Sequence, residues 1–230
     1  MIDWHSHILP GMDDGSRNVK ESLEMLAMQA SQGVKTVIAT PHFYANDETV
    51  EKFLDRRQRA FAQLQTQLPE NMPEILLGAE VRYYPGISHM AELDSLRIGN
   101  SSLLLLEMPV ARWTEYSVRE LIELAGKSNL QIVLAHMERY LKWQKQILWE
   151  RLREYGILMQ VNAAFITSIK WKHKAMAMLT EGSIHFVGSD CHNLTSRSPK
   201  LEEAFSLIQK KLGDEFVSQM HEYGYAVLAK

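Results

Sequence analysis

The chain opens with MIDWHSH at residues 1–7 and continues with ILPGMDDGS at residues 8–16. Alternate side chains of a β-strand point to one face, so the pattern predicts that Asp3, His5 and His7 share a face. The loop that follows contains proline and glycine and predicts a turn that brings Asp13 or Asp14 back toward the two imidazoles. Two imidazoles on one face can bind one metal ion, but a motif this short does not establish a metal site alone.

Composition and charge restrict the classes of protein to consider. The chain has 230 residues, of which 46% are hydrophobic, and this is enough for a single α/β domain over residues 1–230. The net charge of −3 gives no electrostatic reason to expect nucleic acid or an anionic membrane as partner. A single cysteine, Cys191, excludes an internal disulfide, and neither a signal peptide nor an apolar run of about 20 residues is visible. We expect a cytoplasmic protein without membrane insertion, and the oligomeric state stays open.

Apolar runs alternate with helical patterns along the chain, which is typical of parallel βα units. After the opening strand, six more strands are predicted at Val34–Thr40, Ile75–Ala79, Leu103–Leu106, Leu130–Ala135, Ile157–Val161 and Ile184–Gly188. The segment Val81–Ser102 has no regular pattern, and we assign no element to it.

Capping signals predict where several helices begin. Asn18 with Glu21, and Ser117 with Glu120, have the spacing of capping boxes, and Asp47 is expected to open a long helix. Further helices are predicted over Leu141–Tyr155, over Ser168–Glu181 and from Leu201 to Leu212, with a short C-terminal segment after the last one.

A polar residue stands at the end of every predicted strand. In chain order these residues are His5 and His7, His42, Glu80, Glu107, His136, Asn162, and Asp190 with His192. The intervals between them fit one strand, one helix and their loops. In a closed parallel barrel the carboxyl ends of all strands lie on one rim, where barrel enzymes have their active sites. The nitrogen and oxygen donors suit Mn, Fe or Zn, with Mg as a further candidate, and their number predicts two or three ions.

Some polar residues near the strand ends are not assigned as ligands. Physical argument does not distinguish Asp13 from Asp14. Asp3 lies deeper in its strand, and we expect it to support a ligand. Four histidines fit no strand end and are interpreted as structural or surface residues, namely His89, His173, His185 and His221.

Seven motifs follow one another along the chain, namely His5-Ser6-His7, Pro10-Gly11-Met12-Asp13-Asp14-Gly15, Ala39-Thr40-Pro41-His42, Gly78-Ala79-Glu80, Glu107-Met108-Pro109, Ala135-His136-Met137-Glu138-Arg139-Tyr140 and Ser189-Asp190-Cys191-His192-Asn193. Together they resemble the PHP (polymerase and histidinol phosphatase) superfamily. More narrowly, the chain resembles the bacterial manganese-dependent protein-tyrosine phosphatases of capsule and exopolysaccharide biosynthesis.

The resemblance implies a distorted (β/α)7 TIM-like barrel with a trinuclear metal site, and it selects Asp14 rather than Asp13. It implies a phosphotyrosyl protein as substrate, such as a tyrosine kinase of capsule synthesis. One departure is Met137, where the subfamily usually has proline. The ligands that the resemblance implies are His5, His7, Asp14, His42, Glu80, Glu107, His136, Asp190 and His192.

Two arginines lie on the predicted rim loops. Arg139 follows His136 by three residues, and Arg197 follows His192 by five. A guanidinium fork matches phosphate oxygens, and the resemblance places both arginines at phosphate-binding positions. The expected reaction is hydrolysis of a phosphomonoester by attack of a metal-held hydroxide. Three aromatic residues are interpreted as lining the entrance or as core, namely Tyr83, Tyr84 and Trp113.

Other functions compete with this interpretation. Cys191 and Arg197 have the Cys-x5-Arg spacing of thiol-based tyrosine phosphatases, but the segment between them has no glycine to let backbone amides surround a phosphate. A PHP phosphatase of a small metabolite, such as histidinol phosphate, would have the same metal centre. A metal-stabilised binding module without catalysis would not need two phosphate-binding arginines. Nucleic-acid cleavage is disfavoured because no basic stripe is visible.

Overall fold

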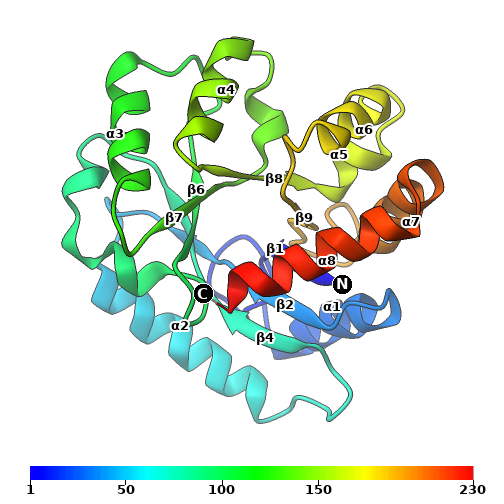
Figure 1. Ribbon diagram of the computed structural model, residues 1–230. Coiled ribbons are helices and arrows are strands. Elements are labelled where there is room, and N and C mark those ends of the chain that lie inside the picture. Colours follow the sequence, from blue (N-terminus) through cyan, green and yellow to red (C-terminus); the bar gives the residue numbers. More distant parts are fainter. Residues whose placement is uncertain (230) are drawn as a thin grey trace.

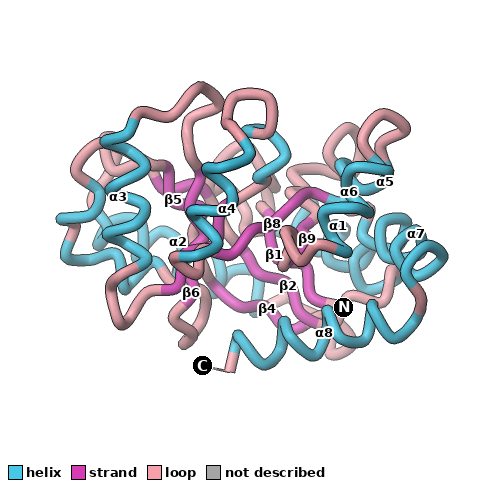
Figure 2. Tube along the Cα trace, turned by 45° about the horizontal axis from the view of Figure 1, so that its top comes forward, coloured by secondary structure: helices cyan, strands magenta, loops and turns pink. Residues whose placement is uncertain are grey.

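A computed structural model describes residues 1–229, and Lys230, the last residue of the predicted domain, lies outside the described part. The strands lie in the middle of the molecule with the helices around them (Figures 1 and 2). The strands are β1 (Ile2–Ser6), β2 (Thr36–Ala39), β3 (His42–Phe43), β4 (Glu74–Leu77), β5 (Glu80–Arg82), β6 (Leu103–Glu107), β7 (Gln131–Leu134), β8 (Leu158–Asn162) and β9 (Phe186–Gly188). The helices are α1 (Val19–Ser31), α2 (Val50–Gln65), α3 (Glu115–Ala125), α4 (Gln146–Glu154), α5 (Ala163–Thr167), α6 (Lys172–Thr180), α7 (Leu201–Leu212) and α8 (Asp214–Leu228), with 3₁₀ turns η1 (Ile87–His89), η2 (Ala91–Leu96) and η3 (Met137–Tyr140).

The strands pair in parallel and form a curled sheet. β1, β2 and β4 pair in that order, and β3, β5, β6, β7, β8 and β9 pair in that order. β9 lies against β1, where Ser6 and Cys191 form a bridge and Asp190 N donates to His5 O at 2.7 Å. Gly188 permits this approach, because a Cβ there would lie 2.6 Å from the Cβ of His5. The prediction of an α/β fold with a parallel sheet is confirmed.

Two of the predicted strands are each interrupted by two residues. β2 ends at Ala39 and β3 begins at His42, while β4 ends at Leu77 and β5 begins at Glu80. His42 and Glu80 therefore come after the ends of β2 and β4, as predicted, but each also begins a short second strand that the sequence did not predict. The two residues pair with each other. Pro41 explains the first interruption, because it has no N–H to continue the ladder.

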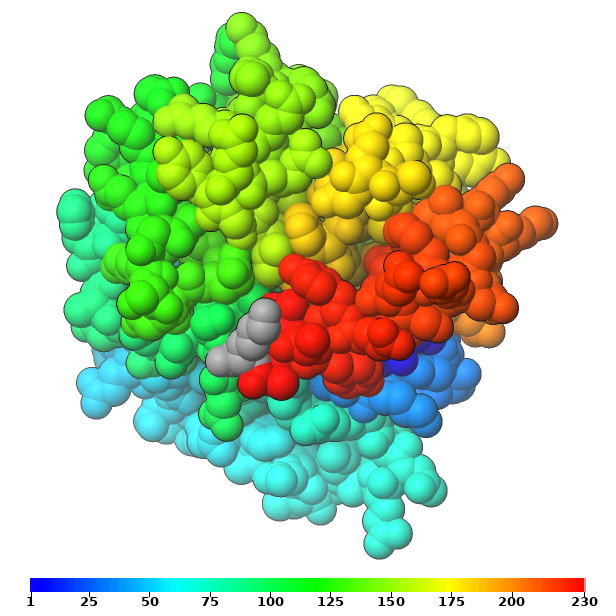
Figure 3. Space-filling model, viewed as in Figure 1, coloured from blue at the N-terminus to red at the C-terminus, as the bar shows by residue number. Residues whose placement is uncertain are grey.

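Apolar side chains fill both sides of the curled sheet. Within it, Trp4 of β1 stacks on Phe186 of β9 with ring centroids 3.7 Å apart. α8 lies across the beginnings of these strands (Figures 1 and 3), with Gly224 close to the Trp4 ring and Val227 in the same apolar cluster. The sequence predicts only a short segment after Leu212, and this prediction is wrong, because a 15-residue helix covers the amino-terminal end of the sheet.

The first two helices differ in how well the capping signals predict them. Asn18 caps α1 as predicted, since its side chain accepts a hydrogen bond from Glu21 N at 3.0 Å. The Glu21 carboxylate, however, accepts from Arg17 N at 2.9 Å instead of closing a box on Asn18. α2 is capped by Thr49 and not by Asp47.

The third helix begins earlier than its predicted capping box. Thr114 caps α3 by accepting from Ser117 N at 3.1 Å, so Ser117 lies inside the helix. Glu120 is buried and accepts from Tyr83 Oη at 2.6 Å and from Gly86 N at 2.8 Å. This carboxylate thereby fixes the start of the segment 81–102, for which the sequence predicts no element. The segment contains the last two residues of β5 and the 3₁₀ turns η1 and η2.

Two of the later helices are shorter than predicted, and one was not predicted. α4 begins only at residue 146, after η3, and α6 begins at residue 172 instead of 168, whereas α5 precedes the predicted range; α7 has the predicted bounds. Tyr83 and Trp113 are buried, and Trp113 packs edge-on against Tyr140, so both belong to the core. Across residues 1–229, the helices are too short or too polar to cross a bilayer.

Candidate metal centre

A β-bulge in β1 sets the direction of the first two histidines. The register against β2 shifts by one residue between Asp3 and Ser6. Asp3 consequently contacts α1, where Gln29 Nε2 donates to it at 2.5 Å, whereas His5 faces Gln160 of β8. The prediction that Asp3 shares the face of the histidines is therefore wrong. Its carboxylate instead accepts from the backbone N–H groups of His5 and Ser189, and this fixes β9 beside β1.

The nine predicted ligands lie together at the carboxyl end of the sheet. Eight of them form three groups in which the donor atoms are within 4.8 Å of one another, and the ninth, His136, contacts the third group through its Nε2, 2.8 Å from Glu80. The three groups are His7, Asp14, His42 and His192; His5, His7 and Asp190; and His42, Glu80 and Glu107. Two histidines belong to two groups each, so the groups are continuous.

Glu80 lies at the middle of this cluster. Its Oε2 is 2.9 Å from His42 Nδ1, 3.1 Å from His5 Nε2 and 3.3 Å from His7 Nε2. His5 Nε2 and His7 Nε2 are themselves only 3.1 Å apart. If two nitrogens bind the same ion at about 2.1 Å each, with an N–metal–N angle of about 90°, they are about 3 Å apart. The observed spacing therefore fits a cation shared by both histidines.

Three buried side-chain atoms that could bind a metal ion show whether the residues present fit such ions. His42 Nδ1, Glu80 Oε2 and His192 Nε2 are buried, and within the described residues none of them has a hydrogen-bond partner. Buried polar atoms are normally paired, because leaving them unpaired is costly. Lone pairs that face one another without hydrogen-bond geometry are what a site for cations requires, so the residues present fit divalent metal ions.

Two of the predicted ligands have an unusual backbone conformation. Among the described residues, the non-glycine residues with positive φ are His136 at 32° and Asp190 at 52°. Such angles cost free energy for a residue with a Cβ and are concentrated at functional sites. The fold maintains them here, where both side chains must turn into the cluster.

Asp13 and Asp14 have different positions, which the sequence alone does not distinguish. Asp13 Oδ2 accepts from His7 Nδ1 at 2.7 Å and from His42 N at 2.9 Å, so it orients the histidines. Asp14 Oδ1 lies 3.4 Å from His42 Nε2 and 3.3 Å from His192 Nε2, on the solvent-exposed side of the cluster. The geometry therefore favours Asp14 as the ligand and Asp13 as the residue behind it.

The charges of the cluster compensate one another. Burial would raise the pKa of Glu80, but the charge of His5 and the hydrogen bond from His136 hold it well below its usual range. Burial would likewise lower the pKa of His7, yet its hydrogen bond to Asp13 and the negative charge of Glu80 raise it to about 10. The carboxylates thus attract positive charge strongly, and metal ions would displace protons from these histidines.

A family comparison agrees with this geometry. The model of a family described as capsular polysaccharide synthesis, CpsB/CapC, matches residues 1–225. The chain belongs to the CpsB/CapC family. It is 32% identical over 233 residues to the tyrosine-protein phosphatase YwqE of Bacillus subtilis, which covers 96% of this chain and 89% of the relative. It is 30% identical over 236 residues to the tyrosine-protein phosphatase CpsB of Streptococcus pneumoniae, covering 93% and 91%.

Solved structures place the chain in the same family. One of them, from a study of YwqE of Bacillus subtilis and CpsB of Streptococcus pneumoniae as metal-dependent tyrosine phosphatases, superposes with a TM-score of 0.82 and 27% identity. That match covers 100% of this chain and 94% of the other. A β-aspartyl dipeptidase of Fervidobacterium islandicum, with a TM-score of 0.51 and 12% identity, shares the fold alone, over 94% of this chain and 67% of its own. The predicted relationship to capsule-type phosphatases is confirmed.

The two predicted phosphate-binding arginines of this CpsB/CapC chain both contact Asp190. Arg139 Nη2 lies 2.5 Å from Asp190 Oδ2, and Arg197 Nη2 lies 2.7 Å from Asp190 Oδ1. Asn162 Nδ2 also donates to Asp190, at 2.8 Å. Both guanidinium groups are about one third exposed, so they lie on the solvent side of Asp190, at the mouth of the cluster.

Sequence reasoning missed two residues that orient the ligands. Gln160 Oε1 accepts from His136 N at 2.7 Å and lies 3.3 Å from His5 Nδ1, so His5 can donate from Nδ1 and present Nε2 to a metal. Tyr140 Oη lies 3.3 Å from His136 Nδ1 and fixes the orientation of that ring. The one signal in the sequence for Gln160 is that it is an amide residue inside the otherwise apolar predicted strand 157–161.

Cys191 is unsuited to be a nucleophile. Its side chain is fully buried, and burial raises the pKa of the thiol far above its ordinary value. The segment between Cys191 and Arg197 does not surround the sulfur with free amides, because His192 N and Asn193 N both donate to Arg197 O. The thiol-based alternative therefore lacks an accessible thiolate.

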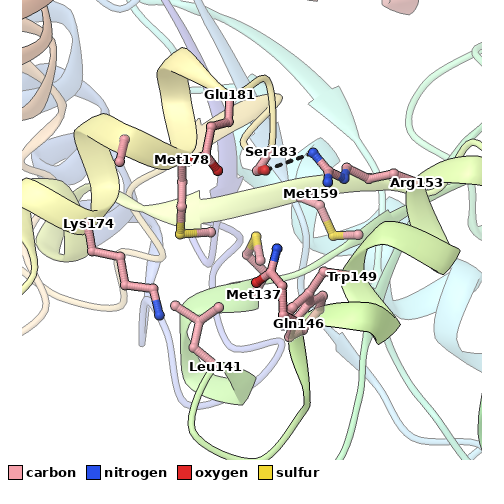
Figure 4. Close-up of a pocket in the computed structure, with 11 residues that line it drawn as sticks. Met137, Leu141, Gln146, Trp149, Arg153, Met159, Lys174, Met178, Glu181 and Ser183 are labelled. Carbon is pink, nitrogen blue, oxygen red and sulfur yellow. Dashed lines mark hydrogen bonds between the residues drawn. The ribbon is translucent and has the colours of Figure 1, made fainter.

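A separate cavity of about 260 Å³ lies between α4 and α6. Figure 4 shows the side chains of Met137, Met159 and Met178 extending into it, with Arg153 bonded to Ser183 at its edge. None of the nine predicted ligands lines this cavity, so it is not the candidate active site.

Proposed function

We propose that this protein is a metal-dependent tyrosine-protein phosphatase. The observation that carries the proposal is the convergence of nine side chains of types that bind metal ions, with two guanidinium groups at their mouth. A purely structural metal site needs neither a phosphate clamp nor an open side. Family membership and similarity to phosphatases of the same length support the activity.

We further propose that the nine residues hold three divalent ions, with manganese as the main candidate. The three donor groups and the absence of thiolate among the donors support this number and type. When bound, such ions lower the pKa of water and polarise phosphoryl oxygens. Asp13, Gln160 and Tyr140 contact Nδ1 of His7, His5 and His136, so that Nε2 of each ring faces the cluster and would be the metal-binding atom.

The arginines have a separate role in the proposed reaction. With Asp190 shared among cations, Arg139 and Arg197 can turn part of their N–H groups to the non-bridging phosphate oxygens and stabilise the charge of the transition state. A tyrosyl oxygen, with a pKa near 10, leaves with less protonation than an alkyl oxygen would need. This favours an aryl phosphate as substrate.

The finer features of the family are also part of the proposal. We infer that the curled sheet is a distorted (β/α)7 barrel in one domain, because the interruptions between β2 and β3 and between β4 and β5 leave seven strand positions. We propose that the protein acts in the cytoplasm and that its substrate is a tyrosine kinase of capsule or exopolysaccharide synthesis, which the family's link to capsule synthesis supports.

One experiment tests activity and metal together. The purified protein is analysed for bound metals and assayed with a phosphotyrosyl peptide before chelation, after chelation, and after return of Mn²⁺, Fe²⁺, Zn²⁺ or Mg²⁺. We expect chelation to abolish hydrolysis and Mn²⁺ to restore it. Faster hydrolysis of histidinol phosphate than of the peptide would instead indicate a metabolite phosphatase. Full metal occupancy without hydrolysis of either would indicate a binding module.

A further inference from the structure

A groove extends from the candidate centre along the surface between η3 and α5. It has a volume of about 440 Å³ and is lined at one end by Arg139 and Asn162. The same two residues line a second hollow of about 180 Å³, which contains Asp190 and Arg197. The groove is therefore continuous with the place where a phosphate would bind. Both η3 and α5 contact β8, and α6 lies beside α5 (Figure 1).

The walls of this groove are mainly apolar. Val110, Phe165 and Trp171 line it, and Val110 is 47% exposed. Next to it, Ile169 is 88% exposed. Apolar side chains of this size in a hollow beside an active site indicate contact with a ligand.

The segments that form and border the groove are basic. Residues 108–114, 139–149 and 163–180 contain seven Lys and Arg residues and no Asp or Glu, although the whole chain has a net charge of −3. One acidic residue, Glu138, also lines the groove, and its carboxylate accepts from Asn162 N at 3.3 Å. Lys142 lines the groove, and Lys170 and Lys174 lie over the Trp171 ring at 4.9 Å and 5.8 Å from its centroid. A cluster of one sign beside an open site attracts ligands of the opposite charge.

We propose that this groove binds the part of the substrate polypeptide that flanks the phosphotyrosine, and that it selects acidic segments containing an apolar side chain. The proposal rests on the proposed function, because the phosphate must lie between Arg139 and Arg197 for the flanking residues to reach the groove. An apolar side chain would lie against Val110 and Trp171, and carboxylates would face Lys142 and Lys170. The groove thus determines which phosphotyrosine is hydrolysed and takes no part in the bond cleavage.

The test compares two phosphotyrosyl peptides that differ in three flanking residues on each side, either Glu or Lys, with a leucine next to the phosphotyrosine in both. Because exposed ion pairs are individually weak but several act together, we expect the wild-type protein to favour the acidic peptide by about tenfold in kcat/KM at low salt, mainly through KM. High salt should reduce the preference, because these charges are screened.

Three variants separate the groove from the metal centre. Lys142→Glu with Lys170→Glu should reduce the preference to below about threefold, whereas Lys210→Glu with Lys211→Glu, on exposed positions of α7, changes the net charge equally and should retain it. Trp171→Ala should raise KM for both peptides. p-Nitrophenyl phosphate is too short to extend from the phosphate site into the groove. Its rate of hydrolysis should stay within about twofold of the wild-type rate in all three variants, which also shows that they fold.

The outcomes distinguish this proposal from the proposed function. If the wild-type protein hydrolyses both peptides equally, the groove proposal is wrong and the phosphatase proposal stands. If it hydrolyses neither peptide, the phosphatase proposal itself fails. Binding to phosphatidylglycerol vesicles that the double substitution at 142 and 170 abolishes, with an unchanged peptide preference, would assign the basic surface to a membrane and overturn the groove proposal.

Discussion

Asp13 Oδ2 accepts a hydrogen bond from His7 Nδ1 at 2.7 Å, although the next residue, Asp14, is the one whose carboxylate lies among the candidate donors. The same Asp13 carboxylate also accepts from Gly15 N, and the loop packs so tightly that a Cβ at Gly15 would lie 2.5 Å from the Cβ of His7. Two adjacent aspartates thus have different roles. Gly15, which has no Cβ, allows the loop that carries them to fold back against His7.

Substitution of Asp13 by alanine should weaken metal binding by about 10- to 100-fold, because His7 would lose the acceptor that fixes its tautomer and ring orientation. Metal affinity is measured by titration of the chelated protein with Mn²⁺. Asp13→Asn is the matched control, since its amide oxygen can still accept from His7 Nδ1, and it should retain most of the affinity. Equal losses in both variants would show that the negative charge matters and that the hydrogen bond does not.

Substitution of Arg139 or Arg197 by alanine should lower kcat by about 100- to 1,000-fold, because each guanidinium would stabilise charge on the phosphoryl oxygens. The measurement is steady-state hydrolysis of a phosphotyrosyl peptide together with metal analysis of each variant. Metal content should stay at the wild-type level, as neither arginine is a candidate ligand. Loss of metal in parallel with activity would mean that the arginines act only by holding Asp190.

Cys191→Ser should leave kcat within about twofold of the wild-type value, because the thiol is buried behind the site and cannot reach a substrate. The hydroxyl is harder to bury than the thiol, and we expect a loss of about 1–2 kcal/mol in the free energy of unfolding. Cys191→Ala controls for the added polarity. A fall in kcat of two orders of magnitude in both variants, with metals retained, would restore the thiol-based alternative.

The sequence predicts the chemistry of the site better than its supporting structure. His136 and Asp190 are predictable because a metal-ligating residue type coincides with the end of an apolar strand. The bulge in β1, by contrast, arises from the register between β1 and β2, and no property of residues 2–6 alone reveals it. Gln160 is missed for a related reason: its function depends on rings that come from two other strands.

Helix boundaries show the same limit. Ser117 and Glu120 have the correct spacing for a capping box, but Glu120 is engaged by Tyr83 and Gly86 from another segment, so tertiary contacts override the local signal. α8 is missed because only Gly224 and Val227 of it are buried, and its position depends on the space left over the Trp4 ring.

Substitution of Glu120 by alanine should destabilise the protein by about 2–3 kcal/mol, because buried donors at Tyr83 and Gly86 would lose their acceptor. Urea unfolding measures the loss, with Glu123→Ala, an exposed residue of the same helix, as the control. Activity at saturating metal should be retained. An unchanged free energy of unfolding would show that the segment 81–102 is held by its apolar contacts alone.

His185 should make the protein less stable in acid. Burial, with a contribution from the charge of Arg153, lowers the pKa of His185 to about 4, and its Nδ1 accepts from Met159 N at 3.0 Å. The unfolded chain, with a histidine pKa near 6.5, binds the proton more readily between pH 6.5 and 4, so the free energy of unfolding falls as the pH falls through that window. Between pH 7.5 and 5.0 the contribution is about 2 kcal/mol.

His185→Asn keeps an acceptor for Met159 N without the titration. In urea unfolding with chelator present, its free energy of unfolding should therefore fall by about 2 kcal/mol less than that of the wild-type protein between pH 7.5 and 5.0. His173→Asn, an exposed position on α6, should behave like the wild type. An equally steep pH dependence in His185→Asn would place the acid sensitivity elsewhere in the molecule.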